Sequence, residues 1–375
     1  MRTFNGVAPL TNDNASSLED VLSRIAASAT ERDENPDFPT EAFRDLASTG
    51  ALAMPAPETP NNSGRRDSFT DEWRVLRAVA RADGSVGRIF DGHLNAVERI
   101  SALAPEPLRS QELEAVTSGE VILGVWGADP IPGEGPPARL SRDGTSISGV
   151  KTWCSGSTGV QRALVLVRSS DDKPGPPHLA YVDTTTGMGV DRSWFKGAGM
   201  RASESHRVIF DDAPVLAVLG EPGELLREPY FARDAIRTAV TWAGMCASAV
   251  DATLAILAAK SGDREPDDLA SLAVGRILTA QGTIDRWLEY AAAEADKDPN
   301  TSLEPFATQL RESVASSCRQ VLDEAARAVG SHPFAVSGVL DLARRNLELF
   351  LLQHRLEPAV ARRGRKAILD AGRTS

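Results

Sequence analysis

The sequence predicts a multidomain α+β protein with an all-α N-terminal domain, a middle β-barrel-like domain and a C-terminal four-helix bundle. Three observations support this prediction: helical periodicity before residue 119, short alternating runs up to residue 219, and helical periodicity again from residue 220. We therefore expect domains over residues 1–118, 119–219 and 220–375. Two all-helical regions around an all-β insert exclude the strand–helix alternation of a dinucleotide-binding doubly wound fold.

The helices and strands follow from local patterns. In the N-terminal region, apolar residues such as Leu18, Val21 and Ile25 recur at helical spacing. In the middle region, Asp143-Gly144 predicts a hairpin between residues 138–142 and 146–150, because this tight turn needs positive φ. Further strands are predicted at residues 163–167, 179–182 and 208–210.

Four amphipathic segments follow residue 220. One apolar stripe runs from Phe306 through Leu310 and Val314 and is ended by Gly330. Since each stripe can be buried only against the others, four such helices predict a bundle. We interpret the basic run at residues 362–366 as a solvated helix face rather than as a polyanion site.

The composition excludes several kinds of partner. The formal net charge is −11 and the basic residues are scattered, which argues against a nucleic-acid surface. No apolar stretch approaches ~20 residues and the N-terminus does not look like a signal sequence, so we expect a cytoplasmic protein without a membrane segment. Cys154, Cys246 and Cys318 are too few and too widely spaced to suggest a disulfide framework or a metal site.

Three segments resemble the acyl-CoA dehydrogenase superfamily of flavoproteins. The most specific is residues 199–206, GMRASESH, followed by VIFDD at 208–212, which is similar to the family's G-M-R-x-S-x-S-x-x-V-x-F-D-D strand. The second is GVKTWCSG at 149–156, which resembles a run that touches the flavin in that family. The third is ADGSVG at 82–87 with His93 shortly after it, which looks most like the family's monooxygenase branch.

The resemblance implies a bound flavin, either FAD or, alternatively, FMN or reduced flavin supplied by a reductase. By position, Trp153 would pack near the isoalloxazine and Ser155 would reach its N5 edge, with Cys154 between them. Trp153 has an alternative interpretation as a core residue of the β-domain. The family's hydroxyl-rich loop is replaced here by a segment that begins with Trp126 and includes Ala128, and we expect both residues near the cofactor.

The resemblance also implies contacts between subunits. The family's arginine that meets the flavin pyrophosphate across a subunit boundary survives at best as Arg264, with Arg327 and Lys260 as other sources of positive charge. Gly330 lies where the family has a Gly-Gly turn. We therefore expect a homodimer or homotetramer in which one subunit completes its neighbour's site.

The catalytic base of the dehydrogenases is missing from its expected positions. Removal of the α-proton of an acyl thioester needs a carboxylate beside the substrate. Of the two places where the family keeps its glutamate, one carries His354 and the other lies about one turn from Asp234. His93, His354 and Asp234 are therefore the candidate acids or bases, since histidine titrates near neutrality. His93 has the alternative role of a hydrogen-bonded helix residue, and His354 that of a surface residue.

Three functions remain open. The first is an FAD-dependent, acyl-CoA dehydrogenase-like oxidoreductase acting on the CH–CH group of an acyl thioester or a related small substrate, with electron-transfer flavoprotein as acceptor. The second is a two-component monooxygenase of the same fold that uses reduced flavin from a partner flavin reductase. The third is a non-catalytic, ligand-binding member of the fold.

Overall fold

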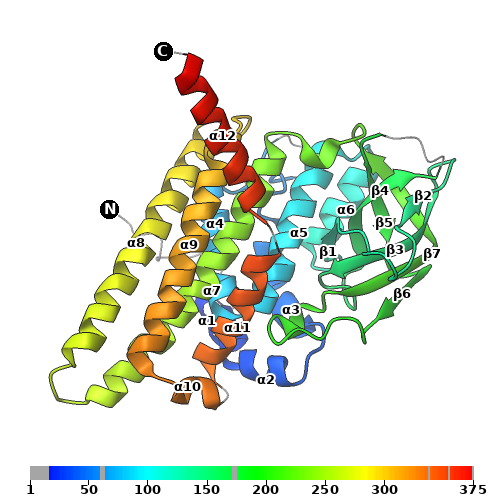
Figure 1. Ribbon diagram of the computed structural model, residues 1–375. Coiled ribbons are helices and arrows are strands. Elements are labelled where there is room, and N and C mark those ends of the chain that lie inside the picture. The colour runs from blue at the N-terminus through cyan, green and yellow to red at the C-terminus, as the bar shows by residue number, and fades with distance from the viewer. Residues whose placement is uncertain (1–16, 60–63, 171–174, 337, 354, 374–375) are drawn as a thin grey trace.

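The computed structural model describes residues 17–59, 64–170, 175–336, 338–353 and 355–373. Figure 1 shows a long helical bundle at one side, a sheet at the other, and the N-terminal helices between them. The elements come in the order helices, strands, helices, which confirms the predicted fold class. The type of secondary structure changes between Thr117 and Leu123 and again between Leu219 and Tyr230. The division into three separate domains stays a prediction.

The N-terminal part is built around two helices that cross closely. Its elements are α1 (Leu18–Ala27), α2 (Ala29–Glu34), α3 (Thr40–Ser48), the 3-10 turn η1 (Ala51–Ala53), α4 (Phe69–Ala82), α5 (Gly84–Leu103) and α6 (Leu108–Thr117). The Asp83 side chain caps α5 by accepting the backbone N–H groups of Ser85 and Val86. A Cβ at Gly87 would lie 2.5 Å from Ala80 Cα, so the close contact of α4 with α5 requires glycine there. The segment at residues 82–87 therefore begins and packs α5.

The strands form a closed sheet. They are β1 (Leu123–Trp126), β2 (Arg139–Leu140), β3 (Ser146–Cys154), β4 (Arg162–Ser169), β5 (His178–Asp183), β6 (Met188–Asp191) and β7 (His206–Leu219). The order is β1-β4-β2-β3-β7-β5, and β5 pairs with β4 again, so five strands return on themselves as predicted for a barrel-like domain. The predicted hairpin is confirmed by the antiparallel pair Leu140–Ile147.

β7 is longer than the predicted segment at 208–210. Its first half pairs with β3 and its second half pairs with β5. Because β7 changes partner along its length, it continues for 14 residues through polar positions that give no strand signal.

The C-terminal part contains the four predicted long helices, one short helix and a further helix at its end. Its elements are α7 (Tyr230–Ser261), α8 (Asp268–Lys297), α9 (Glu304–Val329), α10 (His332–Ala335), α11 (Val339–Leu352) and α12 (Glu357–Arg373). Among the described residues of α12 none is buried, and Figure 1 shows this helix extending beyond the bundle. The basic run therefore lies on a solvated helix, as expected.

Helix α7 is the centre of the helical core. In the described part of the chain it is the one helix long and apolar enough, by length and composition, to cross a membrane, whereas the sequence reasoning expected no such segment. Half of its most apolar window is buried inside the protein, where α7 packs against α4, α9 and α11. Its apolarity is therefore explained by core packing.

A close contact joins the loop before β7 to α11. A Cβ on Gly199 would lie 2.1 Å from the Arg345 carbonyl oxygen, so only glycine fits there. The next residue, Met200, donates its backbone N–H to Asn346 Oδ1 at 2.6 Å. Arg345 also pairs with Asp33 at 2.8 Å. The G-M-R segment is thus fixed to the helical part of the protein.

Candidate functional site

The two most specific sequence segments lie side by side at one end of β3. Ser155 Oγ lies 2.9 Å from Ser205 Oγ, which lies 2.7 Å from Ser203 Oγ. The backbone supports this contact, because Gly156 donates its N–H to the Ser203 carbonyl at 2.8 Å. All three serines are buried. Two segments about 50 residues apart in the sequence therefore build one hydroxyl chain, which we call the serine chain.

The segment after β1 is bound to the same strand end. The Trp126 indole N–H donates to the Ser155 carbonyl at 3.0 Å. The Thr152 backbone N–H donates to the Ala128 carbonyl at 3.1 Å, and the Lys151 ammonium donates to Asp129 at 2.7 Å. The structure therefore brings Trp126, Ala128 and Ser155 together, and their contact with a cofactor stays a prediction.

Trp153 presents an aromatic surface beside the serine chain. Its backbone has φ = 57°, which is uncommon for a bulky residue and turns it away from the strand. Its side chain remains 41% exposed, so the alternative interpretation as a core tryptophan is wrong. The ring contacts Trp194 and Phe195 in edge-to-face geometry, with centroids 5.2 and 5.8 Å away. The neighbouring Cys154 is fully buried, and burial raises the pKa of its thiol well above the usual range.

His93 is held by backbone groups on both sides. Its Nδ1 accepts the Leu123 N–H at 3.0 Å, so Nε2 carries the proton and donates to the Leu52 carbonyl at 3.0 Å. Burial lowers the pKa of His93 to about 4. The ring is neutral at physiological pH and both nitrogens are occupied, which favours the alternative of a structural, hydrogen-bonded histidine.

Asp234 belongs to a buried ionic cluster. This cluster lies where α4, α5 and α7 meet and consists of Arg65, Glu72, Glu98, Arg99, Arg233, Asp234 and Arg237. Asp234 pairs with Arg99, while Arg237 binds Glu72 at 2.6 Å and Glu98 at 2.8 Å. Burial raises the pKa of Asp234 to about 6, although Arg99 and Arg237 act to lower it. The carboxylate predicted as a base is therefore committed to an arginine.

Within one subunit, the remaining predicted residues do not lie at the serine chain. Arg264 lies in the exposed turn between α7 and α8 and donates to the Lys260 carbonyl at 3.2 Å. Arg327 and Gly330 lie at the end of α9, where Gly330 has φ = 79°. Figure 1 shows this end of the bundle on the side away from the sheet. His354 lies outside the described residues.

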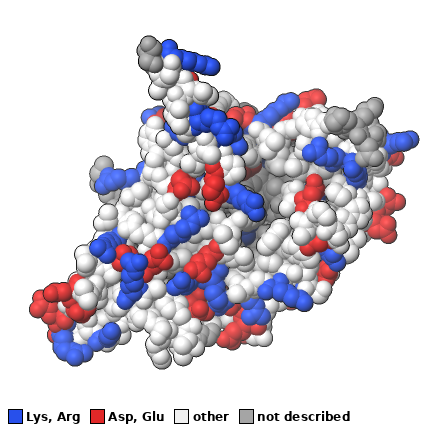
Figure 2. All heavy atoms as spheres, viewed as in Figure 1, with Lys and Arg blue, Asp and Glu red and all other residues white. Residues whose placement is uncertain are grey.

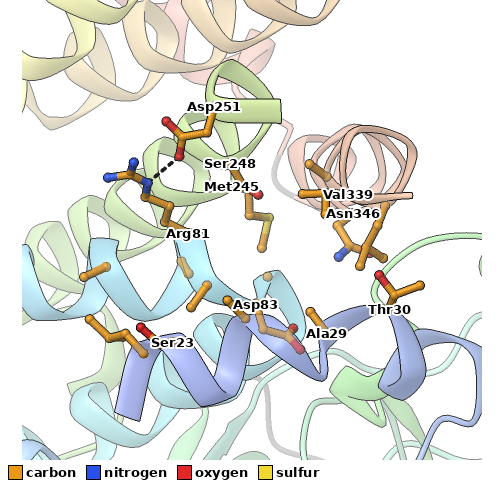
Figure 3. A pocket seen from close by; sticks show the side chains of 18 residues that line it. Ser23, Ala29, Thr30, Arg81, Asp83, Met245, Ser248, Asp251, Val339 and Asn346 are labelled. Atoms are coloured by element: carbon orange, nitrogen blue, oxygen red, sulfur yellow. Dashed lines mark hydrogen bonds and ion pairs between the residues drawn. The ribbon is translucent and has the colours of Figure 1, made fainter. Parts of the chain in front are cut away.

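A cavity of 420 Å³ lies elsewhere, between α1, α4, α7 and α11 (Figure 3). Asp83 and Gly84 of the third sequence segment line it, with Met245 from α7. The pair Arg81–Asp251, at 2.6 Å, lies at its wall. The third segment therefore contributes to this cavity and to the start of α5.

Several residues at the site were not predicted from the sequence. Ser203 and Ser205 were visible in the S-x-S part of the quoted segment, and Trp194-Phe195 was visible as an aromatic pair just before it. The ionic cluster had no local signal, because its members come from three helices and a loop. On the face seen in Figure 2 the surface is hollowed between the helical bundle and the sheet, in the region of α5 and β1.

Comparison with known proteins relates this arrangement to a family. Residues 17–120 match the family model described as acyl-CoA dehydrogenase, N-terminal domain. The chain is 27% identical over 230 residues to a dibenzothiophene monooxygenase from Rhodococcus erythropolis. This match covers 58% of the chain and 52% of the relative, so the chain spans about half the length of that curated relative.

Two solved structures share the fold over nearly the whole chain. One is TdsC from Paenibacillus sp. A11-2 with FMN and indole, with a TM-score of 0.76, 18% identity and coverage of 92% of this chain and 95% of TdsC. The other is a nitrososynthase from Micromonospora carbonacea var. africana, with a TM-score of 0.78, 24% identity and coverage of 93% and 94%. The chain thus has the acyl-CoA dehydrogenase-like fold, and its residues 17–120 match that family's N-terminal domain.

Proposed function

We propose that the chain is a flavin-dependent monooxygenase that takes reduced flavin from a separate reductase and oxygenates a small molecule. The observation that carries this proposal is the pairing of Asp234 with Arg99 inside the buried ionic cluster. A dehydrogenase needs a carboxylate that is free to accept the α-proton of a thioester. The nearby Glu98 is bound by Arg233 and Arg237 and is no better placed. The monooxygenase named among the relatives supports the same choice.

The residues at the end of β3 fit a flavin. The exposed indole of Trp153, supported by Trp194 and Phe195, offers an apolar face to a flat ring system. Ser155 can donate its hydroxyl proton to the ring edge. When bound, reduced flavin supplies the two electrons with which one atom of O₂ is transferred to the substrate and the other leaves as water. FMN or FAD, in reduced form, meets these requirements.

The serine chain orients the Ser155 proton. If Ser203 donates to Ser205 and Ser205 donates to Ser155, the proton of Ser155 Oγ is free to point at the bound ring. Ser205 then both accepts and donates, and Ser155 accepts from Ser205 while its own proton stays available to the ring. Because the three serines are buried, water does not compete for these hydrogen bonds.

The flavin phosphate requires positive charge that the serine chain does not provide. Arg264, Arg327 and the turn at Gly330 lie at the far end of the bundle, and in a homodimer or homotetramer they could complete a neighbouring subunit's site. Arg264 and Arg327 are exposed, so they are free to reach another subunit. We place this two-component system in the cytoplasm, where reduced nicotinamide for the reductase is available.

The test uses isotopically labelled oxygen. Purified chain is mixed with FMN, a flavin reductase, NADH, ¹⁸O₂ and a panel of small aromatic and sulfur-containing compounds that includes indole. We expect a product that carries one ¹⁸O atom only when the chain is present. Bound oxidised flavin that is bleached by an acyl-CoA would support the dehydrogenase instead. Failure to bind oxidised or reduced flavin at micromolar concentration would favour the non-catalytic, ligand-binding alternative.

A further inference from the structure

Next to the ionic cluster, Arg88 and Arg311 both interact with the one carboxylate of Asp91, on which Arg237 also acts. Asp91 on α5 is fully buried and lies 3.3 Å from Arg88 NH1 and 3.1 Å from the Asn95 side-chain amide. Asp91 interacts electrostatically with Arg311 on α9. Burial lowers the pKa of Arg311 to about 10, while Asp91 acts to raise it, so Arg311 is a cation at neutral pH. This group therefore carries one positive charge in excess.

Four N–H donors of this group have no hydrogen-bond partner among the described residues. They are Nε and NH2 of Arg311, Nε of Arg88 and Nε1 of Trp242, and all four nitrogens are buried. A buried charged donor without a partner costs about 1–3 kcal/mol or more, so such groups are usually paired. Their accumulation in one place indicates that a partner belongs there.

The unpaired donors surround one pair of aromatic rings. The Arg311 guanidinium carbon lies 5.4 Å from the Trp242 ring centroid, and the Arg88 guanidinium carbon lies 5.4 Å from that of Phe350. The two rings pack edge to face, with centroids 6.1 Å apart. Cation–π contact compensates part of the buried charge, but it leaves the N–H groups without acceptors.

This group adjoins the serine-chain site. A Cβ on Gly92 would lie 3.7 Å from Arg88 NH1 and 3.9 Å from the backbone nitrogen of Val125. Val125 precedes Trp126, whose indole holds the Ser155 carbonyl. A small molecule bound against Arg88 would therefore approach the end of β1, where the proposed flavin contacts begin.

We propose that Arg88, Arg311 and the Trp242 indole N–H form an oxyanion site that binds a carboxylate of the substrate. This inference rests on the proposed function, because it assigns the substrate class of the same site. One excess positive charge matches a singly charged oxyanion, and guanidinium and indole N–H groups are donors that suit carboxylate oxygens. The rings of Trp242 and Phe350 would contact the apolar part of such a substrate.

A structural role and a ligand-binding role of Arg311 predict opposite effects of Arg311→Leu on stability. If Arg311 stabilises the fold through its cation–π contact with Trp242, replacing Arg311 by leucine lowers the thermal midpoint of unfolding. If Arg311 serves a ligand, the free protein already bears the cost of an unpaired buried charge, and Arg311→Leu leaves stability unchanged or raises it. The thermal midpoint without ligand distinguishes these cases.

The experiment compares benzoate with benzamide, two probes of nearly the same shape that differ in charge. Binding to the full chain is measured by calorimetry at constant ionic strength. We expect benzoate to bind at least tenfold more tightly than benzamide, and Arg311→Leu to abolish this preference. Arg319→Leu, an exposed arginine on the same helix, serves as the matched control and keeps the preference. Arg311→Gln replaces the leucine variant if the latter does not fold.

Two results would overturn the proposal: a wild-type chain that shows no preference for benzoate up to 10 mM, roughly the concentration at which weak anion binding is still measurable, or a preference that survives in Arg311→Leu. A separate titration with reduced FMN keeps the two proposals distinguishable. Flavin binding without a benzoate preference contradicts the oxyanion site alone. A benzoate preference without flavin binding contradicts the monooxygenase alone.

Discussion

Ser155 and Ser205 share a hydrogen bond of 2.9 Å between their buried hydroxyl groups, and this bond joins the two sequence segments that most resemble a flavoprotein family. Ser203 continues the chain at 2.7 Å from Ser205. The contact makes Ser155 the residue best placed to donate to a ring at the end of β3.

Substitution of Ser155 tests this role. We expect Ser155→Ala to weaken binding of reduced FMN about two- to twelvefold, since one hydrogen bond contributes about 0.5–1.5 kcal/mol. Ser205→Ala should have a smaller effect in the same direction, because it acts only by orienting Ser155. Anaerobic fluorescence titration measures both, with the exposed Ser148→Ala as control. Equal affinities in the Ser155 variant and the wild type would remove Ser155 from the site.

His93 predicts a pH-dependent stability. Its pKa is lowered from 6.5 to about 4, so the unfolded chain binds this proton at higher pH than the folded chain does. The contribution of His93 to the free energy of unfolding is fully present above pH 6.5. It falls as the pH decreases toward 4, by an amount on the order of 3 kcal/mol. Urea unfolding at pH 7.5 and 5 should show a smaller loss in His93→Gln than in the wild type. The exposed His332→Gln should behave as the wild type does.

Arg237 should be the most sensitive member of the ionic cluster. Arg237→Leu leaves Glu72 and Glu98 buried with less compensation, and we expect a loss of about 3–5 kcal/mol in the free energy of unfolding. The matched control is Arg81→Leu, which breaks a pair with Asp251 in which both side chains are 47% exposed. Its loss should be below about 1 kcal/mol. Similar losses in both variants would contradict this view of the cluster.

Gly199 tests the contact between the G-M-R segment and α11. Gly199→Ala puts a methyl group into the Arg345 backbone, and we expect a destabilisation of about 2–3 kcal/mol. Gly189→Ala is the control, because the nearest atom to its Cβ would be 3.9 Å away, and it should change stability by less than about 1 kcal/mol. Denaturant unfolding compares the two variants. An unchanged free energy of unfolding in Gly199→Ala would mean that the segment can move away from α11.

The fold could be predicted from periodicity because each long helix carries an apolar stripe and the hairpin carries its turn residues. The bounds of α12 could not be predicted, and only its basic run indicated a solvated helix face, since α12 buries none of its described residues and therefore needs no apolar stripe. The second half of β7 was also missed, because its pairing with β5 depends on sheet closure and not on local composition.

Candidate site residues that are neighbours in the sequence could be proposed from it, whereas contacts between distant residues could not. Trp126, Trp153 and Ser155 belong to short segments whose pattern is visible in the sequence. The pairing of Arg99 with Asp234 joins α5 to α7 across more than 130 positions, and nothing in either helix indicates it. His93 was a candidate because of its place beside the segment that resembles the monooxygenase branch, but its backbone partners are visible only in three dimensions.

The affinity of the chain for reduced and oxidised FMN tests the proposed monooxygenase most directly, because it needs no knowledge of the substrate. A protein that receives reduced flavin from a reductase must capture it before free O₂ consumes it. Under anaerobic conditions we predict that reduced FMN binds at least tenfold more tightly than oxidised FMN, a difference of about 1.4 kcal/mol. Tighter binding of the oxidised flavin, with bleaching by an acyl-CoA, would contradict this function.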